Sequence, residues 1–370
     1  MIDIRTPDNF EWRFVLVAMG ILAVGVISIY SVAPGPAPGG QTPLYAKQLA
    51  WILIGTLAFL AAIAIDYHKL ARHAYVLYAV MLIVLALVLV MGKSSRGAQR
   101  WFSLGPIAFQ PSEVAKLALV LVLAKYFADV QRSGWVQRVI VPGLLTLPGL
   151  LLILKQPDLG TAMSFTFIFV SMVLVSGLHA KALGMGILFT SMLFPFAWEL
   201  IWTSLHDYQR ERILTFWDPM IDPAGKGYHA LQARIAIGAG GLLGKGLDEA
   251  TQSRLKFLPE GHTDFVFAVF AEQWGFIGVL VLFLLFAALI FLASEIAFKA
   301  RDPLGLLLAA GVLSTLGFCL MVNVGMTMGI FPIVGIPLPL MSYGGTTTVT
   351  SMAALGLLLN VKRRRLTLFY

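Results

Sequence analysis

The stretch AYVLYAVMLIVLALVLVM, residues 74–91, decides the fold, because it carries no charged side chain and is long enough to cross a bilayer as one helix. Other apolar stretches flank it along the chain. We therefore predict an all-α polytopic membrane protein of about ten transmembrane helices, with a single integral membrane domain over residues 1–370. The predicted spans are residues 12–32, 47–65, 72–91, 112–130, 139–154, 161–178, 182–205, 273–296, 304–330 and 344–361.

The composition supports this class. The chain is 58% hydrophobic and 12% charged, whereas soluble domains carry about 25% charged residues. A net charge of +8 fits basic membrane-flanking loops and anionic lipid, so nucleic acid is not expected as a partner. One cysteine, Cys319, cannot form an internal disulfide. The histidines show no HxxxH or HExxH spacing, which argues against a dedicated metal site.

The basic tail KRRR, residues 362–365, orients the protein. Under the positive-inside rule this tail is cytoplasmic, and an even number of spans puts the N-terminus on the same side. The segment 206–263, between the seventh and eighth predicted spans, then forms one large extracytoplasmic loop.

Cations also gather on the predicted outer side. Many lie in the 206–263 loop, to which the rule does not apply because the loop is long, but Lys93, Arg96 and Arg100 lie in a short loop. They bind either anionic lipid headgroups or an anionic ligand at the outer face, and topology alone leaves both explanations open.

The glycine-rich stretch IAIGAGGLLGKG, residues 235–246, is similar to a phosphate-binding loop but lacks two of its requirements. Ala239 stands where the Walker A motif needs glycine, and Gly246 stands where a hydroxyl residue would hold magnesium. We interpret the stretch as a flexible loop with close packing, and we expect no nucleotide there.

Two predicted spans open with ionisable side chains. In FQPSEVAK (109–116), Glu113 and Lys116 share one helix face, so they either neutralise each other or serve a function. In LKQPDLGT (154–161), Asp158 opens the sixth span, and stabilisation of a helix N-terminus is favoured for it.

Two further motifs flank spans. In HDYQRERI (206–213), Arg210 and Arg212 are either solvated or bidentate ligands for phosphate. In MSYGGTTT (341–348), structural roles are favoured: side chains such as Ser342 can cap a helix, and the two glycines allow close backbone approach.

The stretch LPEGHTDFVF, residues 258–267, places an acid directly before an apolar run. If a helix begins near Thr263, Asp264 lies in its first turn as a cap or as a base. Glu272 is then about 12 Å away along the helix, which is beyond the about 5–9.5 Å of a glycosidase carboxylate pair. One base with cations nearby instead suits attack by a hydroxyl group when a pyrophosphate leaves.

Six motifs in order now carry a resemblance over residues 12–361. Together they resemble the shape, elongation, division and sporulation family of bacterial cell-wall polymerases. The short N-terminus, the first motif and the stretch TQSRLKFLPEGHTDF are more similar to the elongation branch of that family than to its division branch. The motifs are GAQRW (97–101), FQPSEVAK, QPDLGT (156–161), HDYQRER, TQSRLKFLPEGHTDFVFAVFAEQWG (251–275) and GIPLPLMSYGG (335–345).

The resemblance implies a multi-pass protein of the bacterial cytoplasmic (inner) membrane with ten spans and both termini cytoplasmic. It implies polymerisation of lipid II into β-1,4 glycan strands at the outer face during cell elongation. The anomeric carbon inverts, and undecaprenyl pyrophosphate leaves. The implied partners are a class B penicillin-binding protein, which is a transpeptidase, and the elongation machinery. The family names no certain cofactor, and a role for a divalent cation stays open.

The resemblance also assigns residues. Asp264 falls on the catalytic acid and is expected to be the general base, while Arg210 and Arg212 are candidates for the pyrophosphate. Gln273 and Thr346 depart from the usual family pattern, which leaves their own roles in doubt. The further candidate substrate contacts are Lys116, Glu113, Asp158, Arg100, His262 and Thr263.

The alternative function is a lipid II flippase or transporter. A flippase needs polar groups through the depth of the membrane, whereas Glu113, Asp158 and Asp264 are predicted to gather at one face. A third hypothesis is a scaffold that only recruits other proteins.

Overall fold

The computed structural model describes residues 11–33, 35, 42–95, 98–104, 107–130, 134–177, 184, 202–203, 210, 214–218, 226–250, 252, 258 and 260–364. Helices dominate this part of the chain. They are α1 (Trp12–Val32), α2 (Leu44–Ala64), α3 (Tyr67–Arg72), α4 (Ala74–Met91), α5 (Pro111–Asp129), the π-helical turn η2 (Val136–Ile140), α6 (Val141–Lys155), α7 (Leu159–Val175), α10 (Lys226–Ala239), α12 (Val266–Phe298), α13 (Pro303–Met328) and α14 (Gly345–Arg364).

Within the described residues, six helical segments are long and apolar enough to cross a membrane. They are α1, α2, α4, η2 with α6, α12 and α13, and α7 is a shorter apolar helix. The predicted spans coincide with these helices and with α5 and α14, except that the seventh, 182–205, lies almost wholly outside the described residues. The 206–263 segment is likewise described only in part, and it includes α10.

One local prediction is wrong. Between α4 and α5 the chain forms a small antiparallel sheet of β1 (Lys93–Ser95), β2 (Ala98–Leu104) and β3 (Ile107–Phe109), so the fold is not purely helical. Helix α12 contains the predicted span 273–296 and begins before it, at Val266. Its helical geometry breaks at Gly275, where φ is 62°.

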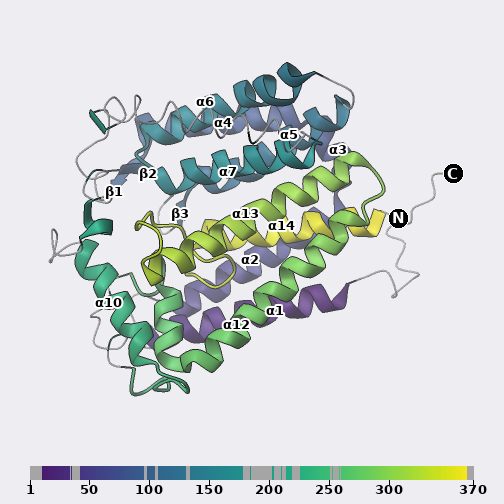
Figure 1. The fold of residues 1–370 in the computed structure, drawn as a ribbon. Coiled ribbons are helices and arrows are strands. Elements are labelled where there is room, and N and C mark those ends of the chain that lie inside the picture. Colours follow the sequence, from purple (N-terminus) through teal and green to yellow (C-terminus); the bar gives the residue numbers. More distant parts are fainter. Residues whose placement is uncertain are drawn as a thin grey trace.

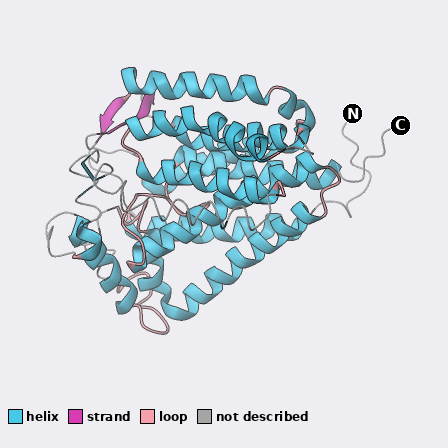
Figure 2. Ribbon diagram, turned by 45° about the horizontal axis from the view of Figure 1, so that its top comes forward, coloured by secondary structure: helices cyan, strands magenta, loops and turns pink. Residues whose placement is uncertain are grey.

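The helices run side by side in a bundle whose two ends differ (Figure 1). The sheet, α10 and the connection between α13 and α14 lie at one end, and the start of α1 and the end of α14 lie at the other. Figure 2 shows the strands beside the helical body at the same end. We call these the sheet end and the terminal end.

The bundle has a continuous apolar interior and an apolar exterior. Large side chains such as Phe165, Ile168 and Phe267 are fully buried between helices. Outward-facing side chains on α2, α4, α6 and α12 are also apolar, which indicates that these faces contact lipid because water would not tolerate so large an apolar surface. Examples are Leu53, Ile83, Val90, Leu144 and Leu284.

The glycine-rich stretch 235–246 is only partly a loop, because α10 extends to Ala239. The interpretation of close packing is confirmed. A Cβ at Gly240 would lie 2.1 Å from the carbonyl oxygen of Ala271, and a Cβ at Gly244 would lie 2.2 Å from that of Gln273. These glycines let the stretch pack directly on the backbone of α12 near its break.

Candidate active site

Asp264 lies at the sheet end, in a turn that we call the Asp264 turn, residues 260–264. Helix α12 starts at Val266, so the acid precedes the helix and does not occupy its first turn as predicted. The backbone N–H groups of Thr263 and Phe265 both donate to the carbonyl of Glu260, at 3.1 and 3.3 Å. Glu260 has a φ of 56°, which lies outside the α-helical range, so helix α12 cannot extend back to this residue.

Three consecutive carbonyls of this turn accept hydrogen bonds from distant parts of the chain. The carbonyl of His262 accepts from the backbone N–H of Tyr343 at 2.8 Å. That of Thr263 accepts from Ser342 Oγ at 2.7 Å. That of Asp264 accepts from Asn323 Nδ2 at 2.9 Å. The backbone of the turn is therefore fixed by neutral donors that do not engage the carboxylate.

The Asp264 side chain is half-buried and lies against Gly335. A Cβ at Gly335 would be 3.2 Å from Asp264 Oδ2, and Gly335 has φ of 73°. Both the close approach and the left-handed backbone require glycine at this position. The segment 329–344, which joins α13 to α14 and which we call the Pro-rich loop, thus forms one wall beside the carboxylate.

The Pro-rich loop also reaches the other predicted site residues. At Gly160, near the start of α7, a Cβ would lie 2.8 Å from Ile336 Cγ1 and 3.0 Å from the Val334 carbonyl. Pro337 and Pro339 line a small cavity that also contains Glu113 and Lys116. The loop therefore connects the Asp264 turn with the starts of α5 and α7.

Asp158 has the structural role favoured by the sequence. It is the N-cap of α7, where Oδ1 accepts from the Thr161 backbone N–H at 3.2 Å and Oδ2 accepts from Thr161 Oγ1 at 2.9 Å. Arg100, on β2, places NH1 3.6 Å from Asp158 Oδ1. Its Nε donates to the Gln156 carbonyl at 3.1 Å, and its NH2 donates to the carbonyl of Pro157. The pair joins the sheet to the α6–α7 turn.

Glu113 and Lys116 form the ion pair that their spacing predicted. Lys116 Nζ lies 2.8 Å from Glu113 Oε1, and only about one twentieth of either side chain is exposed, at 5% and 6%. A buried pair is stable only when both partners remain, because either charge alone would be desolvated without compensation. The cavity beside the pair is further lined by Thr315, Cys319, Thr347, Thr350 and Ser351.

Arg210 is held by the segment before it. Its Nε and NH2 donate to the carbonyls of Trp202 and Thr203, both at 2.9 Å, and its guanidinium lies 5.9 Å from the centre of the Trp202 ring. Arg212, the second predicted arginine of this motif, lies outside the described residues.

Ser342 was predicted as a hydroxyl side chain that caps a helix. In the structure its hydroxyl group instead donates to the carbonyl of Thr263 in the Asp264 turn.

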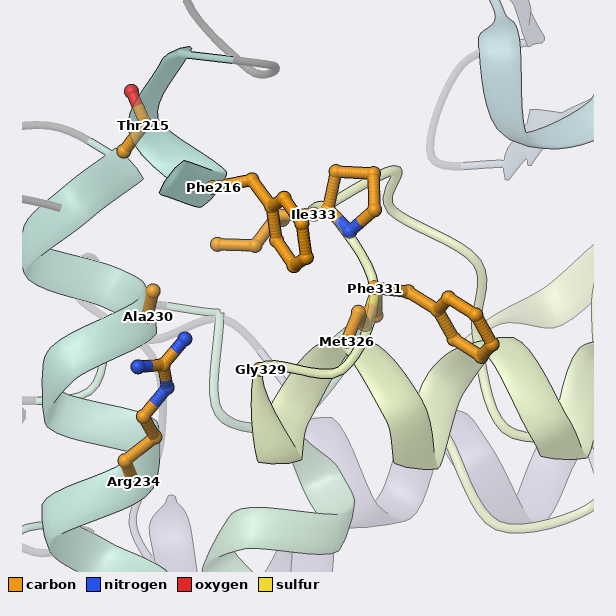
Figure 3. A pocket seen from close by; sticks show the side chains of 9 residues that line it. Thr215, Phe216, Ala230, Arg234, Met326, Gly329, Phe331 and Ile333 are labelled. Atoms are coloured by element: carbon orange, nitrogen blue, oxygen red, sulfur yellow. The ribbon is translucent and has the colours of Figure 1, made fainter. Parts of the chain in front are cut away.

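The structure adds Arg234, which the sequence did not single out. Arg234 extends from α10 into a shallow pocket against the end of α13 (Figure 3). At Gly329, where φ is 77°, a Cβ would collide with its guanidinium. No sequence spacing joins these two residues, so only the fold could reveal the contact. The pocket is lined by Thr215, Phe216, Ala230, Arg234, Met326, Gly329, Phe331, Pro332 and Ile333.

Among the described residues, no group of three or more His, Cys, Asp or Glu side chains could hold a metal ion. Glu272, the other acid considered near Asp264, is fully buried in α12 and accepts from the Gln252 backbone N–H at 2.9 Å. Asp264 is thus the half-buried acid that lies against Gly335 of the Pro-rich loop.

The structure is an apolar helix bundle in which hydrogen bonds to the backbone hold Asp264 at the sheet end. Comparison with known proteins shows the family to which the chain belongs. Residues 11–366 match the model of the FtsW/RodA/SpoVE family, described as cell cycle proteins. The chain belongs to this family.

Curated relatives cover nearly its whole length. The chain is 37% identical over 358 residues to the peptidoglycan glycosyltransferase MrdB of Escherichia coli (strain K12), which covers 96% of this chain and 94% of the relative. It is 31% identical over 432 residues to the peptidoglycan glycosyltransferase RodA of Treponema pallidum, with 98% and 100% covered.

Solved structures share the fold. One chain from a peptidoglycan synthase complex that coordinates polymerization and crosslinking matches with a TM-score of 0.82 and 36% identity, over 96% of this chain and 98% of that chain. RodA of Thermus thermophilus, in a variant with one aspartate replaced by alanine, matches with a TM-score of 0.72 and 33% identity, over 97% and 99%.

Proposed function

We propose that this protein is a peptidoglycan glycosyltransferase that polymerises lipid II into β-1,4 glycan strands. The observation that carries the proposal is the clamped, half-buried Asp264 at the sheet end of a family member whose relatives have this activity in their names. The match to a chain of a peptidoglycan synthase complex supports the same reaction.

In the proposed mechanism Asp264 is the general base. Its carboxylate takes the proton from the acceptor's 4-hydroxyl while that oxygen bonds to the donor's anomeric carbon. The bond from this carbon to the undecaprenyl pyrophosphate breaks on the opposite face, so the carbon inverts. The pyrophosphate leaves as a stable anion, so one carboxylate is sufficient, and a positioned base typically contributes about 10²–10⁴-fold.

The leaving pyrophosphate needs cations. Arg210 and Arg212 remain our candidates, because guanidinium groups bind phosphate oxygens in a bidentate way. The pocket position of Arg234 adds a third. His262 and Thr263 flank the base on the same turn. Glu113, Lys116, Asp158 and Arg100 are candidates for contacts farther along the substrate, where they would keep their present partners.

The proposed setting is the bacterial inner membrane. Ten spans, cytoplasmic termini and an extracytoplasmic 206–263 loop would put the sheet end, and Asp264 with it, at the outer face. The start of α1 and the end of α14 lie at the same end of the bundle, which supports this proposed topology (Figure 1). The proposed partners are a class B penicillin-binding protein and the elongation machinery, in line with the synthase complex that the fold matches.

The test is polymerisation of purified lipid II by the reconstituted protein and its penicillin-binding partner, with the products resolved on a gel. A ladder of glycan strands from the wild type supports the proposal. No ladder, together with movement of lipid II across vesicle membranes, would establish the flippase instead.

A further inference from the structure

We infer that Asn323 and Ser342 are positioning residues for Asp264, so that they set the rate of the reaction without touching the substrate. The inference rests on the proposed function, in which Asp264 acts as the base. It concerns two neutral side chains: Asn323, which belongs to no sequence motif, and Ser342, which was predicted from the sequence only to cap a helix.

Asn323 joins the backbone of the Asp264 turn to that of the Pro-rich loop. Its side chain is fully buried in α13. One hydrogen bond from Nδ2 goes to the carbonyl of Asp264 at 2.9 Å and a second goes to the carbonyl of Ile336 at 2.7 Å. Ile336 directly follows Gly335, the residue that lies against the carboxylate. A single amide therefore fixes the turn that bears the acid and the wall beside it.

Ser342 makes a second connection between the same two segments. Its Oγ donates to the carbonyl of Thr263 at 2.7 Å and accepts from the backbone N–H of Leu338 at 2.8 Å. Gln48 on α2 supports it, because Gln48 Oε1 accepts from the backbone N–H of Gly344 at 3.3 Å. The Asp264 turn is thus tied to the Pro-rich loop on two sides.

Burial of the Asn323 side chain costs free energy, and the two hydrogen bonds that it donates explain why an asparagine stands there. Asn323 Oδ1 is buried and has no hydrogen-bond partner within the described part of the chain. A leucine of similar size would avoid that unpaired oxygen in an otherwise apolar helix. What asparagine supplies, and leucine cannot, is the pair of hydrogen bonds to the Asp264 turn and the loop.

The test compares Asn323→Leu and Ser342→Ala with the wild type in the reconstituted complex, measuring kcat and KM for lipid II. Because misplacement of a catalytic group by about 1 Å can cost about 100-fold, we expect kcat to fall about 10- to 100-fold while KM stays within about twofold. A variant that raises KM and leaves kcat unchanged would overturn the inference.

Two matched variants separate positioning from folding. Asn360 is also a fully buried asparagine that donates to backbone carbonyls, those of Ala62 and Ile63, but at the terminal end. Ser28 is a fully buried serine that bonds only within α1. We expect Asn360→Leu and Ser28→Ala to keep the wild-type kcat per folded molecule. An equal loss of kcat in these controls would reduce Asn323 and Ser342 to ordinary packing.

Hydrogen exchange makes the result independent of activity. Peptides that span residues 260–266 should exchange faster in Asn323→Leu and Ser342→Ala than in the wild type and in Asn360→Leu. If the wild type makes no glycan, the proposed function fails. The exchange pattern would still show whether Asn323 and Ser342 hold the backbone of the Asp264 turn. Unchanged exchange in both variants would overturn the inference even when the wild type is active.

Discussion

The two ends of the bundle share one hydrogen-bonding arrangement but differ in the polar groups around it. At each end a fully buried asparagine donates to backbone carbonyls, Asn323 at the sheet end and Asn360 at the terminal end. At the terminal end, Arg364 NH1 forms an ion pair with Asp66 at 3.1 Å, and His68 Nε2 lies 3.4 Å from Asp302.

At the sheet end, the three described donors to the carbonyls of residues 262–264 are neutral: a backbone N–H, a hydroxyl and an amide. The Arg364–Asp66 ion pair at the terminal end joins α14 to the start of α3, whereas these neutral groups hold the backbone that bears Asp264. The comparison indicates that neutral groups position the backbone of the Asp264 turn.

The largest effect on stability is expected at the Glu113–Lys116 pair. Glu113→Gln removes the negative charge and leaves a buried lysine ammonium, which should cost about 3–5 kcal/mol of unfolding free energy. The matched control is Asp129→Asn on the same helix, which breaks the exposed pair that Lys125 makes at the terminal end. That change should cost about 0–1 kcal/mol. Thermal unfolding in detergent compares the two, and equal losses would contradict a buried, desolvated pair.

Gly335→Ala should lower the free energy of unfolding by less than Glu113→Gln does, and it should also lower kcat. The left-handed backbone should cost about 1–2 kcal/mol, and the new methyl group must push the Asp264 carboxylate from its place, so kcat should fall. Gly329→Ala carries the same backbone strain but meets Arg234. We expect it to raise KM for lipid II and to spare kcat. Steady-state kinetics of both variants measure this, and identical kinetic defects would remove the distinction.

The smallest effect is expected at Asp66, in the terminal-end cluster. Burial raises the pKa of this carboxyl, but hydrogen bonds from His68 and the charge of Arg364 lower it by more, so the net shift is downward. A lowered folded-state pKa gives stability that is present above about pH 3.9 and is lost as the pH falls further.

Because Asp66 is partly exposed, the contribution should be at most about 1 kcal/mol. Denaturation at pH 7 and at about pH 3.5 should show a smaller acid loss for Asp66→Asn than for the wild type. An identical acid loss in both proteins would show that the Asp66 cluster contributes nothing at the terminal end.

The sequence predicted the helices well, because the spans are long apolar runs with few charges, as lipid requires. It missed the small sheet, since β1 and β3 have three residues each and a polar strand between helices gives little periodic signal. The helix considered from near Thr263 in fact begins at Val266, so Asp264 lies just before it.

The candidate site was likewise predicted only in part. Asp264, Asp158 and the Glu113–Lys116 pair stand out because acids at the ends of apolar runs are rare. Asn323 gave no signal, since one amide inside an apolar helix belongs to no motif. Its bond to Asp264 joins residues 59 positions apart, and the Ser342 bond joins residues 79 apart. Local patterns carry no information about contacts of that kind.

The role of Asp264 as the base is tested by the polymerisation rate of Asp264→Asn at saturating lipid II, with lipid II binding measured on the same preparation. The substitution keeps the shape of the side chain and the backbone carbonyl that Asn323 holds. We predict a rate lower by about 10²–10⁴-fold, with lipid II binding and the partner complex retained. A rate within a few-fold of the wild type would contradict the assignment of Asp264 as the base.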